Sequence, residues 1–373
     1  MAATGGTGAR QEPAPETLID WDRLLDRAPI ATDPAVLTET FAGRRVAITG
    51  AAGSLGRELS MMIAAYGPAA LTLIDSSEAG LFALRERLLL VGYDEARLRF
   101  ALADMRNRRR IATIFTAARP EIVFHLAAYK HVPWAEAEPS EYLDANLGGG
   151  QVVIEEAARA GVARLVYPST DKAVNPPSLY GATKRIIEAQ LREVAATSAL
   201  RCVASRFVNV LGSQGSVGVT FARRIASGQP LPITDAAMDR YWIAPQHGTL
   251  LLTAAAAPAF DEPFTILLPD ALPAVPVVEI ARRIWERLGH SGEPPLVITG
   301  SRPGERLHEE LTGAGETYEP GPYHGILHVR GMAPAPTGTP IAEGIVALRG
   351  AIEDGGAEHE LKARALAWAH AIH

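Results

Sequence analysis

A glycine-rich turn between an apolar run and a helix-like pattern most constrains what this chain can fold into. The run RVAIT (45–49) leads directly into GAAGSLG (50–56). Glycine is needed where the backbone turns tightly, approaches a pyrophosphate or packs a helix on a strand, and free amides at the helix start then face the phosphates. We therefore predict a dinucleotide-binding turn whose cofactor-binding residues are Gly50, Gly53, Ser54, Leu55 and Gly56. The spacing is GxxGxxG rather than the commoner GxGxxG, so a purely structural loop remains the alternative for this turn taken alone.

Five further apolar runs follow the first one, with helix-length stretches between them. They are ALTLID (70–75), RLRFALAD (97–104), IVFHLA (122–127), RLVYPS (164–169) and RCVASRF (201–207). The runs lack strict polar alternation, which is typical of strands buried on both faces of a parallel sheet. Strands that alternate with helices in this way predict an α/β fold with a doubly wound parallel sheet.

The pattern divides the chain into four parts. Residues 1–43 are interpreted as a flexible tail and a helical lead-in, and residues 44–210 as the dinucleotide-binding domain. Glycine and proline become frequent beyond this domain, so we expect a smaller C-terminal substrate-binding lobe at 211–331. Residues 332–373 are expected to form a proline-rich connector and C-terminal helices. The apolar positions that suit an amphipathic pair of helices are Ile345, Leu348, Ile352, Leu361 and Leu366.

Composition and charge exclude several classes of function. The formal net charge is −6, and a mildly acidic chain offers no basic surface for nucleic acid. Cys202 is the only cysteine, so no internal disulfide can form, which fits a reducing compartment. Pro258 interrupts the longest apolar stretch, and the N-terminus lacks the apolar middle of a signal peptide, so we expect no membrane span and a cytoplasmic protein. No His, Cys and carboxylate residues have metal-ligand spacing, and we predict no metal.

Two acidic residues at strand ends extend the predicted cofactor site. Asp75 ends the second run, nineteen residues after Gly56, where a carboxylate can bind both ribose hydroxyls. An acidic group there repels a 2′-phosphate, and no arginine occurs in the following segment 76–78, so we expect NAD rather than NADP. Asp104 ends the third run and could bond the adenine amino group, although capping of the following helix explains it equally well.

A cluster of reactive side chains follows the fifth run. Thr170, Asp171 and Lys172 end that strand, and Tyr180 and Lys184 follow four residues apart, on one face of a helix. A tyrosine near a lysine ammonium and a positive nicotinamide ring has a lowered pKa, so it can take a proton from a sugar hydroxyl. Tyr-x-x-x-Lys alone also fits a solvated helix face. Its position after a Thr-Asp-Lys strand end, downstream of a dinucleotide fold, favours catalysis.

The segment STDKAVNPPSLYGATK (169–184) resembles the active-site segment of nucleotide-sugar 4,6-dehydratases of the extended short-chain dehydrogenase/reductase superfamily. More narrowly, the chain resembles the bacterial polysaccharide-biosynthesis group that acts on UDP-N-acetylglucosamine. Other matching stretches are TGAAGSLG (49–56), HLAAYKHVP (125–133), RFVNVLGSQGSV (206–217), MDRYWI (238–243) and SRPGERLHEEL (301–311). The resemblance extends from about Ile19 to the last helix. It implies a Rossmann-like fold, a UDP-sugar substrate, NAD and a homo-oligomer.

The resemblance further implies a redox-neutral dehydration. Tyr180 would take the proton of the C4 hydroxyl while hydride leaves C4 for NAD, and the resulting ketone acidifies the hydrogen on C5. Lys172, as a free amine, would abstract that hydrogen, Asp171 would protonate the departing C6 hydroxyl, and the hydride would return to C6. Thr170 would support the first proton transfer, and Lys184 would hold the nicotinamide ribose and depress the pKa of Tyr180.

These roles set a condition on charge. Asp171 must be protonated and Lys172 neutral during part of the cycle, whereas the ordinary pKa values of these side chains in water favour a charged carboxylate and a charged ammonium. Desolvation favours both states, whereas the mutual attraction of the two charges opposes both. A simple ion pair at a strand end is therefore the structural alternative for Asp171 and Lys172.

For the substrate, the resemblance assigns Asn209 and Arg302 to the UDP diphosphate, with Lys130 and Arg240 also facing the pocket. Arginine suits this task because its fork donates two parallel bonds to phosphate oxygens. His125 lies in a strand-end segment, where a hydrogen-bonded structural histidine is commoner than a catalytic one.

Two other functions remain open. A 4-epimerase uses the same tyrosine and hydride but needs no acid-base pair for elimination, so Asp171 and Lys172 argue against it. A non-catalytic dinucleotide-binding sensor or scaffold shares the fold, but such proteins usually lose the tyrosine or lysine that this chain keeps at Tyr180 and Lys184. In the family that this chain resembles, glycine occupies the position of Val208 (RFGNV), and a bulkier residue beside Asn209 would tighten the pocket around the sugar or the diphosphate.

Overall fold

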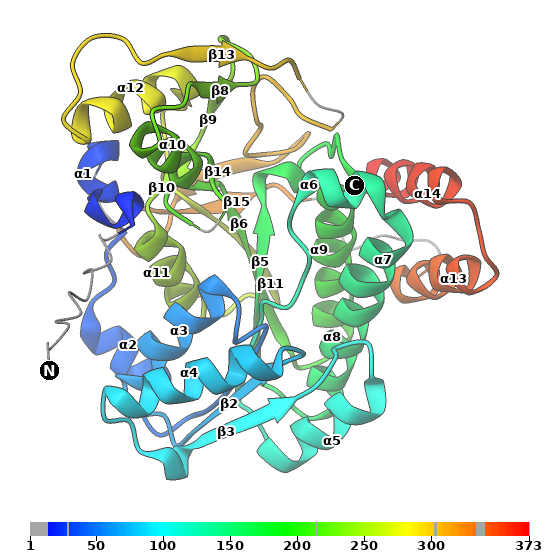
Figure 1. The fold of residues 1–373 in the computed structure, drawn as a ribbon. Helices are drawn as coiled ribbons and strands as arrows, with labels where there is room; N and C mark the ends of the chain where they lie inside the picture. The colour runs from blue at the N-terminus through cyan, green and yellow to red at the C-terminus, as the bar shows by residue number, and fades with distance from the viewer. Residues whose placement is uncertain (1–13, 28–29, 214, 302–303, 333–339, 373) are drawn as a thin grey trace, which may run out of the picture.

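A nine-stranded sheet runs through the molecule (Figure 1). The computed structural model describes residues 14–27, 30–213, 215–301, 304–332 and 340–372. The strands of the sheet are β1 (Arg45–Thr49), β2 (Ala70–Asp75), β3 (Leu98–Leu102), β4 (Ile122–His125), β5 (Arg164–Thr170), β6 (Arg201–Phe207), β11 (Phe264–Pro269), β14 (Thr317–Pro320) and β15 (Ile326–Arg330). Their order is β14-β15-β11-β6-β5-β4-β1-β2-β3. Pairing is parallel from β3 to β11, whereas β15 is antiparallel to β11 and β14 to β15.

All six predicted apolar runs form strands of this sheet, and the predicted doubly wound α/β fold is confirmed. The third and fourth strands are shorter than predicted, because 97–104 and 122–127 include residues of the flanking turns. The sheet also contains β11, β14 and β15, which come from the region 211–331 that we expected to form a separate lobe. Every residue of β11 is buried, and a strand that is apolar on both faces needs cover on both, which the central sheet provides.

Helices cover both faces of the sheet. One face carries α3 (Ser54–Ala64), α4 (Glu78–Leu90) and α11 (Pro245–Ala255), and the other carries α5 (Arg108–Ala118), α8 (Gly150–Arg159) and α9 (Leu179–Thr197) (Figure 1). A 3-10 turn, η2 (Glu95–Arg97), joins α4 to β3. In α3 the buried Leu59 and Ile63 are one turn apart, so this helix turns a single apolar stripe to the sheet.

A second hydrophobic core lies beyond the sheet. Its residues come mainly from α10 (Val217–Ala226), β8 (Leu231–Ile233), β10 (Trp242–Ile243), β12 (Val275–Pro276), α12 (Val277–Arg287) and β13 (Leu296–Ile298). Two further short strands, β7 (Asn209–Val210) and β9 (Asp239–Arg240), pair with strands of this lobe. The strands pair two by two, as β10 with β7, β12 with β9 and β13 with β8. The lead-in also belongs to this core, since Leu24 and Leu25 of α1 (Trp21–Leu25) pack within it. The lead-in contains two further helices, η1 (Pro15–Leu18) and α2 (Pro34–Phe41).

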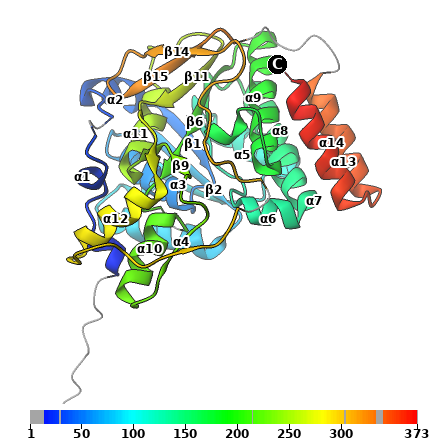
Figure 2. The same cartoon turned by 90° about the horizontal axis from the view of Figure 1, so that it is seen from above.

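Two C-terminal helices form an outer layer. Figure 2 shows α13 (Ile341–Glu353) and α14 (Glu358–Ala371) side by side against α9. These two helices contact α7 (Pro139–Leu143) and the π-helical turn η3 (Asp144–Gly149), and α6 (Val132–Ala137) packs on α7 and α9. The predicted apolar positions Ile345, Leu348 and Leu361 are buried here. No helix among the described residues is long and apolar enough to cross a membrane.

Candidate active site

The glycine-rich turn is built for a close approach of backbone to backbone. Gly50 has a φ of +70°, and a Cβ there would lie 2.6 Å from the Ala127 amide nitrogen. A Cβ at Gly56 would lie 2.2 Å from the Gly50 carbonyl oxygen. Gly53 caps α3 without a side-chain hydrogen bond to the first-turn amides, which begin at Ser54 and Leu55. The turn therefore leaves a helix N-terminus open to an anion, as its sequence predicted.

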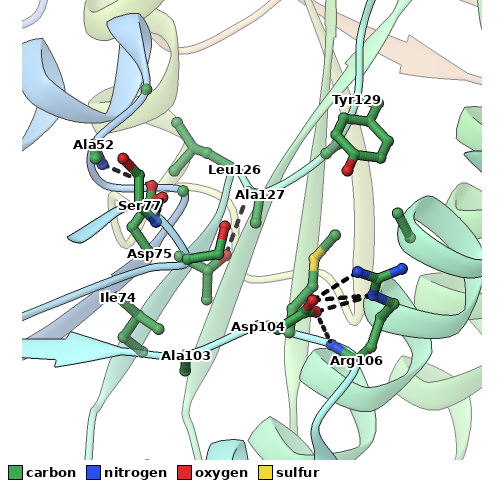
Figure 3. Close-up of a pocket in the computed structure, with 17 residues that line it drawn as sticks. Ala52, Ile74, Asp75, Ser77, Ala103, Asp104, Arg106, Leu126, Ala127 and Tyr129 are labelled. Atoms are coloured by element: carbon green, nitrogen blue, oxygen red, sulfur yellow. Dashed lines mark hydrogen bonds and ion pairs between the residues drawn. The ribbon is translucent and has the colours of Figure 1, made fainter. Parts of the chain in front are cut away.

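A cavity of about 350 Å³ opens beside this turn (Figure 3). Its lining comes from the turn itself and from the segments that follow β2, β3 and β4. Asp75 projects into it from the end of β2, where its carboxylate accepts hydrogen bonds of 2.9 Å from the amides of Ala52 and Ser77. These two bonds leave the carboxylate with further acceptor capacity. The predicted ribose-binding group thus lies at the predicted phosphate turn.

Asp104 lines the same cavity but is held by an arginine that sequence reasoning missed. Nη2 of Arg106 lies 2.7 Å from Oδ2 of Asp104, and this hydrogen bond keeps the pKa of Asp104 below its ordinary value despite partial burial (Figure 3). Arg106 Nη1 also reaches Glu141 at 3.1 Å and Asp144 at 3.3 Å. The capping alternative for Asp104 is wrong, because the side chain of Asn107 caps α5.

The predicted acid and base adjoin each other after β5. Asp171 and Lys172 form the 3-10 turn η4 (Asp171–Ala173), and Lys172 Nζ lies 3.0 Å from Asp171 Oδ1. Thr170 donates a hydrogen bond of 2.9 Å to the same oxygen. Asp171 is fully buried, and its Oδ2 has no hydrogen-bond partner among the described residues.

Lys172 is held by a second carboxylate that the sequence did not single out. Glu309 Oε1 lies 3.1 Å from Lys172 Nζ, and its side chain is 3% exposed. Burial lowers the pKa of Lys172, but the charges of Asp171 and Glu309 outweigh burial and hold this pKa above its ordinary value. The attraction between Lys172 and the two carboxylates therefore outweighs its desolvation. The sequence alone did not show which of the two effects is larger.

Tyr180 reaches this turn because the residue after it is glycine. Tyr180 lies in the first turn of α9, and a Cβ at Gly181 would lie only 2.0 Å from the Lys172 carbonyl oxygen. The helix therefore touches η4 at a point where no side chain fits. Contrary to the expected lowering, burial raises the pKa of Tyr180 to about 12, although the charge of Lys172 and a hydrogen bond with Thr170 lower it.

Lys184 lies one turn further along α9 and differs from the expectation in one respect. Its Nζ donates a hydrogen bond of 2.8 Å to the Pro168 carbonyl and lies 4.4 Å from the ring centre of Tyr167. The same atom is 6.0 Å from the ring centre of Tyr180, and the cation that lowers the pKa of Tyr180 is Lys172 instead. Burial lowers the pKa of Lys184 to about 7.

One amide links the cavity to the catalytic helix. Asn146, in η3, accepts a hydrogen bond from the Tyr129 amide at 2.9 Å and donates to the Tyr129 carbonyl and to Thr183 of α9. Tyr129 lines the cavity, so hydrogen bonds through Asn146 connect the predicted cofactor site to the helix that carries Tyr180 and Lys184. His125 is structural, as expected: it is buried, bonds Thr49 at 2.8 Å, and has a pKa lowered to about 3 by burial and by Lys184.

The residues predicted to bind the substrate differ in their exposure and in their hydrogen-bond partners. Asn209 lies in β7 with its side chain partly exposed and 3.4 Å from the Tyr241 carbonyl. Lys130 is exposed on the loop after β4, next to Tyr129. Arg240, expected to face the pocket, is buried and donates to the Leu307 and Arg306 carbonyls at 2.9 and 2.8 Å. Arg302 lies outside the described residues.

Comparisons with known proteins agree with this geometry. A family model described as polysaccharide biosynthesis protein matches residues 46–330. The probable polysaccharide biosynthesis protein EpsC of Bacillus subtilis is 34% identical over 304 residues, covering 79% of this chain and 49% of that protein. An inverting UDP-N-acetylglucosamine 4,6-dehydratase of Campylobacter jejuni is 31% identical over 296 residues, covering 77% and 83%. The chain thus spans about half the length of EpsC and most of the Campylobacter enzyme.

A solved structure resembles the fold as well. DesIV, a dTDP-glucose 4,6-dehydratase from Streptomyces venezuelae solved with NAD bound, has a TM-score of 0.59 and 25% identity, over 72% of this chain and 88% of that one. The family match extends from β1 through β15, and so includes both the glycine-rich turn and the Thr-Asp-Lys turn. The chain therefore belongs to the polysaccharide biosynthesis protein family, a dehydratase-like group within the extended short-chain dehydrogenase/reductase superfamily.

Proposed function

We propose that this protein is an NAD-dependent nucleotide-sugar 4,6-dehydratase, with UDP-N-acetylglucosamine as its substrate. The observation that carries the proposal is the pair formed by Lys172 and Asp171, 3.0 Å apart and packed against the helix that bears Tyr180. Elimination of water breaks a C–H and a C–O bond on neighbouring carbons, so it needs a base and an acid side by side. A 4-epimerase needs neither group.

The cavity suits a dinucleotide on three counts. The turn at Gly50 and Gly56 excludes a Cβ, the α3 N-terminus has no side-chain cap, and Asp75 offers a carboxylate to a ribose. NAD rather than NADP is supported because Arg106, which also lines the cavity, already bonds three carboxylates and Asp75 repels a 2′-phosphate. NAD bound here would supply the hydride acceptor for C4 and the hydride donor for C6.

The acid and base need one proton transfer to reach their working states. Moving a proton from Lys172 Nζ to Asp171 Oδ1, along their 3.0 Å contact, converts the ion pair into a free amine and a carboxylic acid. The net charge of the pair does not change, so a buried site tolerates the transfer. Lys172 could then take the C5 proton while Asp171 protonates the leaving C6 hydroxyl. Because burial raises the pKa of Tyr180 to about 12, its phenol would have to lose its own proton before it could accept that of the C4 hydroxyl; the charge of Lys172 and a hydrogen bond with Thr170 favour this loss.

Asp171 keeps one acceptor free for a sugar. Its buried Oδ2 has no hydrogen-bond partner among the described residues, and an unpaired buried acceptor costs about 1–3 kcal/mol. A hydroxyl of a bound hexose would remove this cost by donating to Oδ2. We assign Asn209 and Lys130, with Arg302, to the UDP moiety of the same ligand.

The experiment is incubation of the protein with NAD and UDP-N-acetylglucosamine in deuterated water, followed by mass spectrometry and NMR. We expect a product lighter by one water, with deuterium at C5. Lys172→Met, which retains Tyr180 but has no base for C5, should form none of this product. An isobaric product would instead indicate the epimerase, and tight NAD binding with no turnover of any UDP-hexosamine would indicate the sensor.

A further inference from the structure

Glu309 is a buried carboxylate placed between two cations of the site. It lies in the coil between β13 and β14 and is 6% exposed. Its Oε1 is 3.1 Å from Lys172 Nζ and 3.6 Å from Arg240 Nε. Its Oε2 has no hydrogen-bond partner among the described residues. A carboxylate is rarely buried in this way unless its charge is paired, so the two cations account for its place.

The coil around Glu309 is fastened at both ends. Upstream, Arg240 donates hydrogen bonds to the Arg306 and Leu307 carbonyls. Downstream, the buried Arg206 of β6 donates to the Leu311 carbonyl at 3.3 Å. Because these anchors flank position 309 closely, the carboxylate is held beside Lys172 without a helix or strand of its own.

We propose that Glu309 is a positioning residue for the dehydration, holding the amine of Lys172 toward the sugar and stabilising the ammonium that forms when this amine takes the C5 proton. The proposal rests on the function proposed above. It gives Lys172 a second, orienting carboxylate besides its acid, in the way that a carboxylate orients the base of a nucleophilic triad.

The charges around Lys172 show why a second carboxylate matters. Asp171 faces it from η4 and Glu309 from the coil, while Arg240 of β9 and the Tyr180 phenol of α9 are its other charged or titratable neighbours. During elimination Asp171 is the acid and gives up its proton to the leaving hydroxyl. Glu309 takes no part in these proton transfers, so its carboxylate stabilises positive charge on Lys172 as that charge develops. Glu309 consequently holds protons on the pair of Lys172 and Asp171 up to a higher pH than the pair alone would.

The test compares Glu309→Gln with the wild type and with Glu310→Gln as a matched control. Gln keeps the shape of Glu309 but removes its charge. Glu310 is the adjacent residue, but its half-exposed side chain bonds Asn175 and pairs with Arg306 rather than Lys172. Glu309→Asp serves as a rescue variant because it retains the charge. Thermal denaturation of each variant verifies folding.

The first readout is the titration of Lys172 itself, which requires no substrate. The chain has four lysines among its 36 lysines and arginines, so 13C-labelling of lysine gives few resonances, and Lys172→Arg identifies the one of interest. In Glu309→Gln the Lys172 pKa should fall by about 1–3 units, and in Glu310→Gln it should not move. Where the wild-type titration lies above the accessible pH, the same comparison in the Asp171→Asn background brings it into range.

The second readout is the pH profile of dehydration. In Glu309→Gln the acidic limb of the kcat/KM profile should move to lower pH. The value of kcat should fall at least tenfold, because an oriented base contributes about 10²–10⁴-fold to the rate, whereas KM should change little. Glu309→Asp should keep the wild-type limb. An unchanged Lys172 titration in Glu309→Gln would overturn the inference. Failure of the wild type to release water would instead sink the proposed function, with the NMR titration still deciding whether Glu309 controls Lys172.

Discussion

The contact between Gly181 and the Lys172 carbonyl makes Gly181→Ala a sharp test of the site. A Cβ at position 181 would lie 2.0 Å from this oxygen, whereas ordinary van der Waals contact begins near 3.4 Å. The obstacle is backbone rather than a flexible side chain, so η4 and α9 would have to separate by roughly 1.4 Å. That movement draws Tyr180 away from Asp171 and Lys172.

The displacement sets the size of the expected effect. A misplacement of about 1 Å can cost about 100-fold in rate, so we expect kcat for water release to fall at least that far. Overpacking should also lower the free energy of unfolding by about 1–3 kcal/mol. NAD affinity should be retained, because the turn at 50–56 is untouched. Mass spectrometry gives the rate, calorimetry the affinity and urea denaturation the stability.

A matched alanine separates the clash from the general effect of replacing glycine. A Cβ at Gly350, in α13, meets nothing within 4 Å. Gly350→Ala should therefore raise stability by up to about 1 kcal/mol and leave the rate unchanged. A folded Gly181→Ala variant that releases water at the wild-type rate would refute the argument that the two elements must touch.

Three further changes test other parts of the structure. Burial favours the neutral form of Glu316, but its contacts with Arg206 outweigh burial and lower its pKa to about 2. Glu316→Gln should therefore lower the free energy of unfolding, measured by urea denaturation, by about 3 kcal/mol at pH 7. This loss should become smaller as the pH falls below about 4.5. Burial lowers the pKa of Lys184 from 10.5 to about 7, so Lys184→Met should raise the free energy of unfolding by on the order of 4 kcal/mol at pH 7. This increase should become smaller as the pH rises toward 10.5. An increase that does not change with pH would contradict the lowered pKa of Lys184. Gly56→Ala places a Cβ 2.2 Å from the Gly50 carbonyl oxygen. We expect NAD affinity, measured by calorimetry, to fall at least tenfold, which corresponds to the loss of roughly one good hydrogen bond.

The strands of the sheet could be predicted because their evidence is local. Each of the six runs from 45–49 to 201–207 is apolar without alternation and is bounded by helix-length segments, and such runs can be buried only in a parallel sheet. The run at 264–269 has the same character, but its place beside β6 depends on pairing between residues about sixty positions apart. The second lobe intervenes between the two strands, and no local pattern records that crossover.

The turn that we predict to be catalytic could be placed from the sequence for the same reason, whereas its surroundings could not. Thr170 to Lys184 lie within one continuous segment, so their spacing alone brings the reactive groups to one strand end and one helix face. Glu309 reaches Lys172 from a coil, and Arg106 reaches Glu141 across the cavity, so neither contact has a periodic signal. Gly181 was visible in the sequence, but only the 2.0 Å approach of a neighbouring carbonyl gives it a reason.

The coil that carries Glu309 has a consequence for how basic residues are used in this protein. Arg240 and Arg206 hold it by donating to several carbonyls and carboxylates at once, a geometry that a single ammonium cannot reproduce. Arginine thus builds the scaffold, whereas three of the four lysines, Lys130, Lys172 and Lys184, belong to the segments assigned to the site. Amine-selective reagents would therefore leave this arginine framework chemically intact.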